Sequence, residues 1–145
     1  MRENIELINV KPEHLPEIYA LVCALEKQEL NLGAFEEVFL ENLEKPSIFY
    51  LAASREGKLV GFVSLHVQRL LHHCGCIGEV QELVVQEGLQ GEGIGAMLLG
   101  RAKDIAREMG CSDLEVACGK KRERSHAFYE KQGMGNTHYK FTFAL

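Results

Sequence analysis

The sequence predicts an α/β domain built on one sheet that is flanked by helices. Runs rich in β-branched and aromatic residues alternate along the chain with segments whose apolar residues recur at helical spacing. Neither an internal repeat, a low-complexity tract nor a linker interrupts the 145 residues. A single domain over residues 1–145 is therefore the most economical architecture.

The first half of the chain predicts a strand, two helices and a hairpin. Residues 5–10 alternate between apolar and polar and are typical of a strand. Two prolines then favour the beginning of a helix, which we expect to end near Gln28, and a second helix is expected around residues 35–43. Two β-rich runs, residues 48–53 and 58–67, lie on either side of a Glu-Gly pair and predict the hairpin.

The second half of the chain continues this alternation. Residues 68–75 form a connector of ambiguous structure, and a central strand follows it. An amphipathic helix then ends at Gly110, and residues 114–117 predict a short strand. Ser125 is a candidate cap for the last helix, and a closing strand is expected at residues 137–143.

A glycine-rich loop joins the central strand, residues 80–85, to the amphipathic helix. Its glycines are Gly88, Gly91, Gly93 and Gly95. A strand that leads through such a loop into a helix exposes free backbone N–H groups at the positive end of the helix dipole. The loop therefore predicts a site for the phosphate or pyrophosphate of a nucleotide.

Two common nucleotide motifs fit this loop poorly. A P-loop would need a lysine and a hydroxyl residue where this chain has Ile94 and Gly95. Gly91, Gly93 and Ala96 also match a permissive dinucleotide fingerprint, and Glu115 lies at a suitable distance downstream. In that fold, however, the first glycine follows directly on the strand and opens the first unit of the chain. The fit to this motif is therefore poor, but a dinucleotide-binding domain stays an alternative.

The loop resembles a third motif more closely. Residues 90–95 read Gln-Gly-Glu-Gly-Ile-Gly and resemble the Gln-x-x-Gly-x-Gly signature of the GNAT acetyltransferase superfamily. Residues 79–85 resemble the central strand of that superfamily, and residues 126–133 resemble its last helix, with Tyr129 in place. Nearly the whole chain is similar to the aminoalkylphosphonate N-acetyltransferases. The segments that carry this narrower resemblance are residues 66–68, 71–73, 77–79, 81–85 and 141–145.

The resemblance implies a GNAT-like fold, a mixed and mostly antiparallel twisted sheet of six to seven strands flanked by about four helices. In that superfamily the first two helices flank the acceptor site, and homodimers are common. The implied activity is acetyl transfer from acetyl-CoA to a small primary amine, with an aminoalkylphosphonate as the leading acceptor. Other acceptors, namely a polyamine, an amino acid, an antibiotic or a protein lysine, remain alternatives, as does a non-catalytic acyl-CoA-binding domain.

The resemblance also assigns the cofactor-binding residues. Glycines let main-chain N–H groups approach the pyrophosphate closely. The pyrophosphate is expected on the loop formed by Gln90, Gly91, Glu92, Gly93, Ile94, Gly95 and Ala96. The pantetheine is implied to pair with the central strand near Leu83 and Val85, and the N–H of Val84 is expected to stabilise the oxyanion. One departure affects this site, because Gly119 stands where the superfamily often has an asparagine that helps to hold the cofactor.

The catalytic acid and base are expected on different elements. By its position in the motif, Tyr129 is the acid that protonates the departing thiolate of coenzyme A. Because an alkylamine with a pKa near ~10 is protonated at pH 7, a carboxylate must take its proton, directly or through a water. Glu79 and Glu82 are the candidates, and Glu79 is favoured. In a regular strand they point to opposite faces, so at most one reaches the acceptor unless a bulge intervenes.

Candidate contacts to an anionic acceptor lie before the central strand. They are His66, Arg69, His72 and His73. The resembled phosphonate enzymes are associated with a divalent metal, and these histidines are candidate ligands or phosphonate donors. The basic run of residues 120–124 is a further candidate for an anion, either the acceptor or the ribose phosphate of coenzyme A.

Composition excludes several other function classes. A net charge of -5 argues against non-specific nucleic-acid binding. An odd set of five cysteines without a Cys-x-x-Cys pair indicates reduced thiols and does not favour structural zinc. The sequence shows neither a basic and apolar leader nor an apolar run of membrane-spanning length, so the cytoplasm is the expected location.

Overall fold

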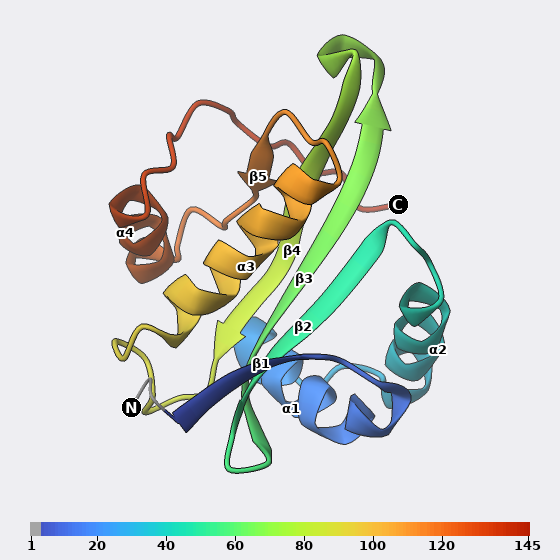
Figure 1. The fold of residues 1–145 in the computed structure, drawn as a ribbon, viewed down its shortest axis with the longest axis vertical. Coiled ribbons are helices and arrows are strands. Elements are labelled where there is room, and N and C mark those ends of the chain that lie inside the picture. Colours follow the sequence, from blue (N-terminus) through green and yellow to red (C-terminus); the bar gives the residue numbers. More distant parts are fainter. Residues whose placement is uncertain (1–3) are drawn as a thin grey trace. The chain divides into compact units, whose positions relative to one another are not determined.

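A computed structural model describes residues 4–145 (Figure 1). The chain divides into two parts after Glu115. The first part contains β1 (Ile5–Asn9), η2 (Pro12–His14), α1 (Leu15–Glu26), α2 (Leu32–Leu43), β2 (Ile48–Arg55), β3 (Lys58–Leu70), η3 (Leu71–His73), β4 (Gly75–Val85) and α3 (Ile94–Glu108). β5 (Leu114–Val116) spans the division, and α4 (Glu123–Lys131) lies in the second part.

The sheet has the strand order β1-β2-β3-β4-β5, and its first four strands are antiparallel neighbours. The predicted hairpin is confirmed, and the connector at residues 68–75, whose structure the sequence left ambiguous, is not a separate segment between the strands. Instead β3 continues to Leu70 and η3 turns the chain directly into β4, so the two strands form one long hairpin (Figure 1). None of the helices in the described chain has the length and apolar character needed to cross a membrane.

The predicted count of six to seven strands is wrong. Residues 4–145 form five strands, and the expected closing strand at 137–143 has no regular structure. A strand is stabilised when one of its faces is buried. The large apolar side chains of this segment are instead almost fully exposed, namely Tyr139, Phe141 and Phe143. Ser125 likewise lies inside α4 and does not cap it, because the helix begins at Glu123 after Arg122.

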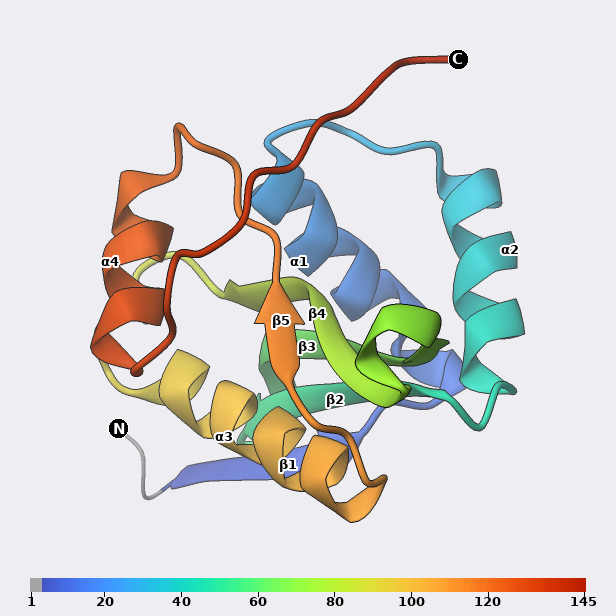
Figure 2. The same ribbon diagram turned by 90° about the horizontal axis from the view of Figure 1, so that it is seen from above.

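Helices cover both faces of the strands in the first part (Figure 2). Successive residues of β3 point to opposite faces. Phe62 packs with α1 and α2 in a core cluster that includes Ile18 and Phe39. Gly61 faces α3, where an added Cβ would lie 3.0 Å from Leu98 Cδ1. The missing side chain at this glycine therefore allows α3 to pack closely against the sheet.

A β-bulge interrupts the pairing of β3 with β4. Ser64 lies opposite Glu82, whereas the next residue of β3, Leu65, lies opposite Val80. Gln81 is consequently the extra residue of β4 and is exposed. One extra residue reverses the alternation of every position that follows it. The bulge therefore changes which groups of β4 face the helices and which face the strand edge.

Candidate functional site

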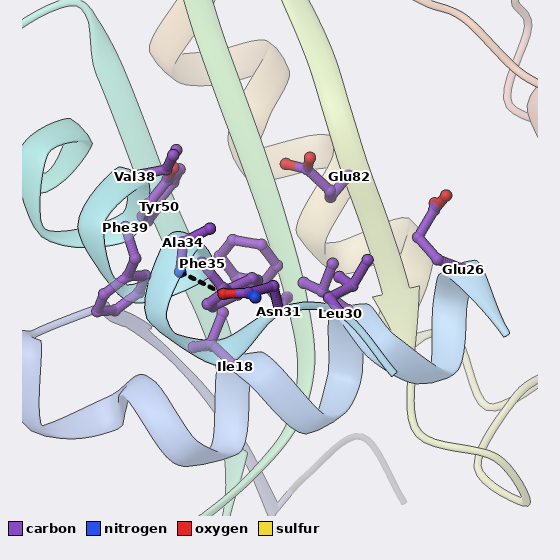
Figure 3. A pocket seen from close by; sticks show the side chains of 12 residues that line it. Ile18, Glu26, Leu30, Asn31, Ala34, Phe35, Val38, Phe39, Tyr50 and Glu82 are labelled. Carbon is purple, nitrogen blue, oxygen red and sulfur yellow. Dashed lines mark hydrogen bonds between the residues drawn. The ribbon is translucent and has the colours of Figure 1, made fainter. Parts of the chain in front are cut away.

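A pocket of about 390 Å³ lies on the sheet face that carries α1 and α2 (Figure 3). Most of its lining is apolar or aromatic. These residues are Ile18, Val22, Leu30, Ala34, Phe35, Val38, Phe39, Tyr50 and Phe62. The polar lining residues are Glu26, Asn31 and Glu82. The volume falls in the range of small-molecule sites, which are typically concave, apolar and provided with a few placed polar groups.

Aromatic rings form the wall of the pocket. The ring centroids of Phe35 and Phe39 are 6.2 Å apart, and those of Phe39 and Tyr50 are 5.8 Å apart. The Tyr50 ring meets Phe62 edge to face at 5.4 Å. α2 places Phe35 and Phe39 one turn apart on one side, because residues four positions apart share a face of a helix. The Asn31 side chain caps this helix by accepting from Ala34 N at 2.9 Å, and so holds its first turn.

The Glu82 carboxylate lies at the β4 side of the pocket (Figure 3), and a buried serine holds it there. The hydroxyl of Ser64, which has no exposed surface, donates to Glu82 Oε1, and Glu82 N donates to Ser64 Oγ at 2.9 Å. Tyr50 of β2 lies opposite Ser64 of β3, which in turn lies opposite Glu82 of β4. Three neighbouring strands therefore contribute one row of polar side chains. Buried, charge-assisted hydrogen bonds of this kind restrict a carboxylate to one orientation.

Tyr50 adds a second polar group to this row. Its hydroxyl accepts from Asn42 Nδ2 at 2.9 Å. Burial raises the pKa of Tyr50, the hydrogen bond from Asn42 lowers it, and the Glu82 carboxylate raises it again, with a net rise above the ordinary value. The phenol therefore stays neutral at pH 7 beside the carboxylate.

Glu79 lies on the same face as Glu82 but outside the pocket lining. Ser64 and His66 are two residues apart on β3 and share a face, and they lie opposite Glu82 and Glu79 respectively. In a regular strand the two glutamates would point to opposite faces of the sheet, but the bulge places them on the same face. Glu79 Oε1 accepts from Gln68 Nε2 at 3.2 Å, further along the hairpin. Of the two candidate bases, Glu82 is the one that lines the pocket.

The bulge also turns the backbone of β4. Before it, Gly78 N donates to Asp113 O at 2.9 Å, on the β5 side. After it, Glu82 N and Gln86 N both donate toward β3, to Ser64 Oγ and Val60 O. N–H groups alternate along a strand, so Val84 N–H also lies on the β3 side. The N–H groups of Leu83 and Val85 consequently face the opposite edge of β4.

The glycine loop leads from β4 into α3 as expected. Gly88, Gly91 and Gly93 all have φ near +90°, and Gly93 stands immediately before the helix. This region of backbone space is open to glycine and disfavoured for other residues. No side chain caps the helix at Gly93. The first N–H groups of α3, from Ile94 onward, therefore form a suitable site for an anion.

Residues 15–134 match the family model described as "Acetyltransferase (GNAT) family". The chain belongs to the GNAT acetyltransferase family. It is an acetyl-CoA-dependent N-acetyltransferase, and the GNAT-like fold expected from the sequence is confirmed.

A sequence relative supports this assignment, and solved structures share the fold. An aminoalkylphosphonate N-acetyltransferase of Salmonella typhimurium is 42% identical over 140 residues, which cover 97% of this chain and 91% of the relative. A solved structure of a putative acetyltransferase from Agrobacterium tumefaciens has a TM-score of 0.86 at 24% identity and covers 97% of this chain and 99% of that one. A solved aminoglycoside N-acetyltransferase in complex with CoA has a TM-score of 0.87 at 14% identity and covers 97% of this chain and 94% of that one. The two solved structures show the fold.

The histidines predicted to form a cluster are spread along the hairpin that β3 and β4 form. His66 lies in β3, whereas His72 and His73 lie in η3 at the tip. The ring centroids of His72 and His73 are 4.5 Å apart. His73 Nδ1 lies 3.3 Å from Asp113 Oδ2, and His73 Nε2 lies 3.7 Å from Glu115 Oε2. Within residues 4–145, the side chains form no group of three or more histidine, cysteine, aspartate or glutamate ligands suited to a metal.

Arg69 and the residues of the basic run are not among the residues that line the pocket. Arg69 is exposed, and the alternation of β3 places it on the face opposite Ser64. It lines a shallow hollow of about 200 Å³ with Leu70, Leu71, Cys74 and Gly75. The basic run at 120–124 belongs to the second part of the chain, where Lys120 Nζ lies 5.5 Å from the centre of the Tyr139 ring.

Tyr129 lies on α4 in the second part and is half-buried. Burial raises its pKa to about 12, with Cys118 adding to the rise and Arg122 opposing it. The side chain is therefore protonated throughout the neutral range.

Sequence reasoning missed Ser64 and Tyr50. A serine and a tyrosine inside β-rich runs look like ordinary strand residues. Only the register of β2, β3 and β4 shows that both lie beside Glu82.

Proposed function

We propose that this acetyltransferase acetylates the primary amine of an aminoalkylphosphonate, with Glu82 as the base. The single observation that carries the proposal is the Glu82 carboxylate, which a buried serine holds in the wall of a ligand-sized pocket. The relative named as an aminoalkylphosphonate N-acetyltransferase supports the acceptor class, because its similarity extends over nearly the whole chain.

The proposed base must act on an ammonium group. An alkylamine with a pKa near ~10 carries its proton at pH 7 and cannot attack a thioester until that proton leaves. Glu82 takes the proton, directly or through one water, and the freed nitrogen then forms the C–N bond while the C–S bond breaks. Ser64 keeps the carboxylate oriented, since its hydroxyl both donates to and accepts from Glu82. Glu79 remains the alternative base.

Acetyl-CoA, when bound, supplies the activated acetyl thioester. The N–H groups around Gly91, Gly93, Ile94, Gly95 and Ala96 would hold its pyrophosphate, and Gln90 and Glu92 belong to the same loop. Glu92 Oε1 lies 2.9 Å from Arg55 Nη2, which ties the loop to the end of β2. Gln90 Nε2 donates to Val85 O at 3.3 Å.

The strand edge and α4 supply the remaining groups in this proposal. Leu83 and Val85 present N–H groups at the edge of β4 that could pair with pantetheine. Val84 N–H lies on the β3 side, so we place the oxyanion donor at Leu83 N–H in preference to Val84. Tyr129 donates its proton to the thiolate, whose conjugate acid has a pKa near ~8.5.

The test is release of free thiol from acetyl-CoA across a panel of amines. Aminoalkylphosphonates, polyamines and amino acids are compared at equal concentrations, and acetylated products are identified by mass spectrometry. Turnover that is selective for phosphonates supports the proposal. Selective turnover of polyamines or amino acids keeps the enzyme class and rejects the acceptor.

A divalent metal is a separate question. The described histidines do not form a three-ligand group, so no step above depends on a metal. Repeating the assay with a chelator and with added divalent ions tests the requirement directly. If the chelator lowers the rate and added metal restores it, His66, His72 and His73 become candidate ligands. A homodimer and a cytoplasmic location both stay predictions from the sequence.

A further inference from the structure

We infer that the pocket binds an apolar, aromatic-sized substituent of the acceptor, while any anionic group of the acceptor stays outside it. The inference rests on the proposed acetyl transfer and adds what the acceptor must look like. Among residues 4–145, the ionisable groups in the lining are the carboxyls of Glu26 and Glu82 and the neutral phenol of Tyr50, and this part of the chain contributes no lysine, arginine or histidine to the lining. A phosphonate placed here would meet like charge in an apolar surrounding, which is costly without a partner.

The size and chemistry of the wall fit a ring. An apolar cavity of roughly 150 Å³ is enough to hold benzene. The pocket has about 390 Å³, so it has room for a phenyl group together with the aminoalkyl chain. The rings of Phe35, Phe39, Tyr50 and Phe62 are already arranged in stacked and edge-to-face contacts. An aromatic substituent can extend these contacts with the same preferred geometries.

The polar groups fix the direction in which such an acceptor lies. Glu82 and Ser64 stand at the β4 side of the aromatic wall, so an ammonium beside Glu82 leaves its substituent against Phe62. The same face of β3 continues past Ser64 to His66 and Gln68. These residues are more polar than the pocket lining, so the anionic end of the acceptor can lie beside them.

The experiment compares two matched pairs of amines. One pair is ethylamine and 2-phenylethylamine, and the other is 1-aminoethylphosphonate and 1-amino-2-phenylethylphosphonate. In each pair the phenyl group should raise kcat/KM roughly 10- to 100-fold, because its surface leaves water on binding. An unchanged or lower kcat/KM in both pairs would overturn the inference even if all four amines are acetylated.

A binding measurement separates this inference from the proposed function. Calorimetric titration of the enzyme with 2-phenylethylamine and with ethylamine reports the pocket without any turnover. Tighter binding of the phenyl compound supports the inference even if no amine is acetylated, in which case the proposed function alone fails. Equal or weaker binding of the phenyl compound rejects it.

A variant pair localises the effect to the pocket. Val38 lines the pocket and is 57% exposed, so Val38→Asp adds a charge to the wall with little risk to folding. Leu40 lies on the same helix, is 40% exposed and is not part of the lining, so Leu40→Asp is the matched control. Val38→Asp should reduce the phenyl advantage at least about tenfold. Equal phenyl advantages in the two variants would place the substituent elsewhere.

Discussion

At the scale of single residues, the site depends on which carboxylate a buried neighbour holds. Glu79 and Glu82 are chemically identical and only three positions apart. Glu82 is hydrogen-bonded to the fully buried Ser64 and lines the pocket, whereas Glu79 is hydrogen-bonded to Gln68 further along the hairpin. The environment of each side chain, rather than its type, therefore distinguishes the two candidate bases.

Glu82→Gln should lower kcat/KM for the best amine by about 10² or more, because the amide cannot accept the ammonium proton. Glu79→Gln is the matched control and should stay within about fivefold of the wild type, under about 1 kcal/mol. Initial rates of thiol release measure both variants, with melting curves to confirm folding. A larger loss in Glu79→Gln than in Glu82→Gln would return the base to Glu79.

Tyr129→Phe should lower the rate of turnover while leaving the affinity for coenzyme A nearly unchanged. The change removes one hydroxyl and its proton but keeps the ring, so packing on α4 is retained. General acid catalysis typically contributes about 10²-fold or more. Thiol release and calorimetric titration with coenzyme A measure the two quantities. A variant that turns over at the wild-type rate has a different acid.

The raised pKa of Tyr129 also predicts how stability changes with pH. A tyrosine in the unfolded chain loses its proton near pH ~10, whereas Tyr129 holds it to about pH 12 in the folded protein. The unfolded state is therefore favoured progressively as pH rises through this window, and the contribution is fully present only below it. Tyr129→Phe should lose stability less steeply from pH 10 upward in urea unfolding. Parallel curves for the two proteins would contradict the shift.

At the scale of elements, a loop and a bulge organise β4. The loop glycines adopt a backbone region that lets the chain enter α3 with its first N–H groups exposed. The bulge at Gln81 reverses the alternation of the strand, so Glu82 joins the face of Ser64 while the Leu83 N–H turns to the edge of β4 that lies away from β3. Acceptor and cofactor contacts can then come from consecutive residues of one strand.

Gly93→Ala should weaken the binding of coenzyme A at least about tenfold, because a side chain disfavours the φ of +89° that positions the helix N–H groups. Gly57→Ala is the matched control in the hairpin turn, where φ is +79° and an added Cβ meets nothing within 4 Å. Both variants should lose about 1–2 kcal/mol of stability, but only the first should lose affinity. Equal affinities by titration would remove the loop from the cofactor site.

At the scale of the whole molecule, an anionic cofactor binds a chain whose net charge is -5. Long-range attraction cannot supply that binding, so local donors must do so. Family membership rests on a match that runs from residue 15 to 134 and thus includes both parts of the chain. Cofactor binding should accordingly be visible in the stability of the protein as a whole.

Acetyl-CoA at about 100 times its Kd should raise Tm by about 5–10 °C, since ligand binding to the folded state alone contributes about 2.7 kcal/mol. NAD at the same concentration should leave Tm unchanged, which distinguishes the acetyltransferase loop from the dinucleotide fingerprint. Scanning calorimetry measures both. A shift with NAD and none with acetyl-CoA would assign the loop to a dinucleotide.

The sequence by itself determined the order of the helices and strands, the glycine loop and the family, because periodicity, glycine placement and motif spacing are local properties of the chain. It could not place the closing strand or the histidines, since a strand needs a partner and a cluster needs separate segments to meet. Only the tertiary structure decided which glutamate lines the pocket. That choice depends on one extra residue in the pairing of β4 with β3, and register is a relation between strands that neither strand carries alone.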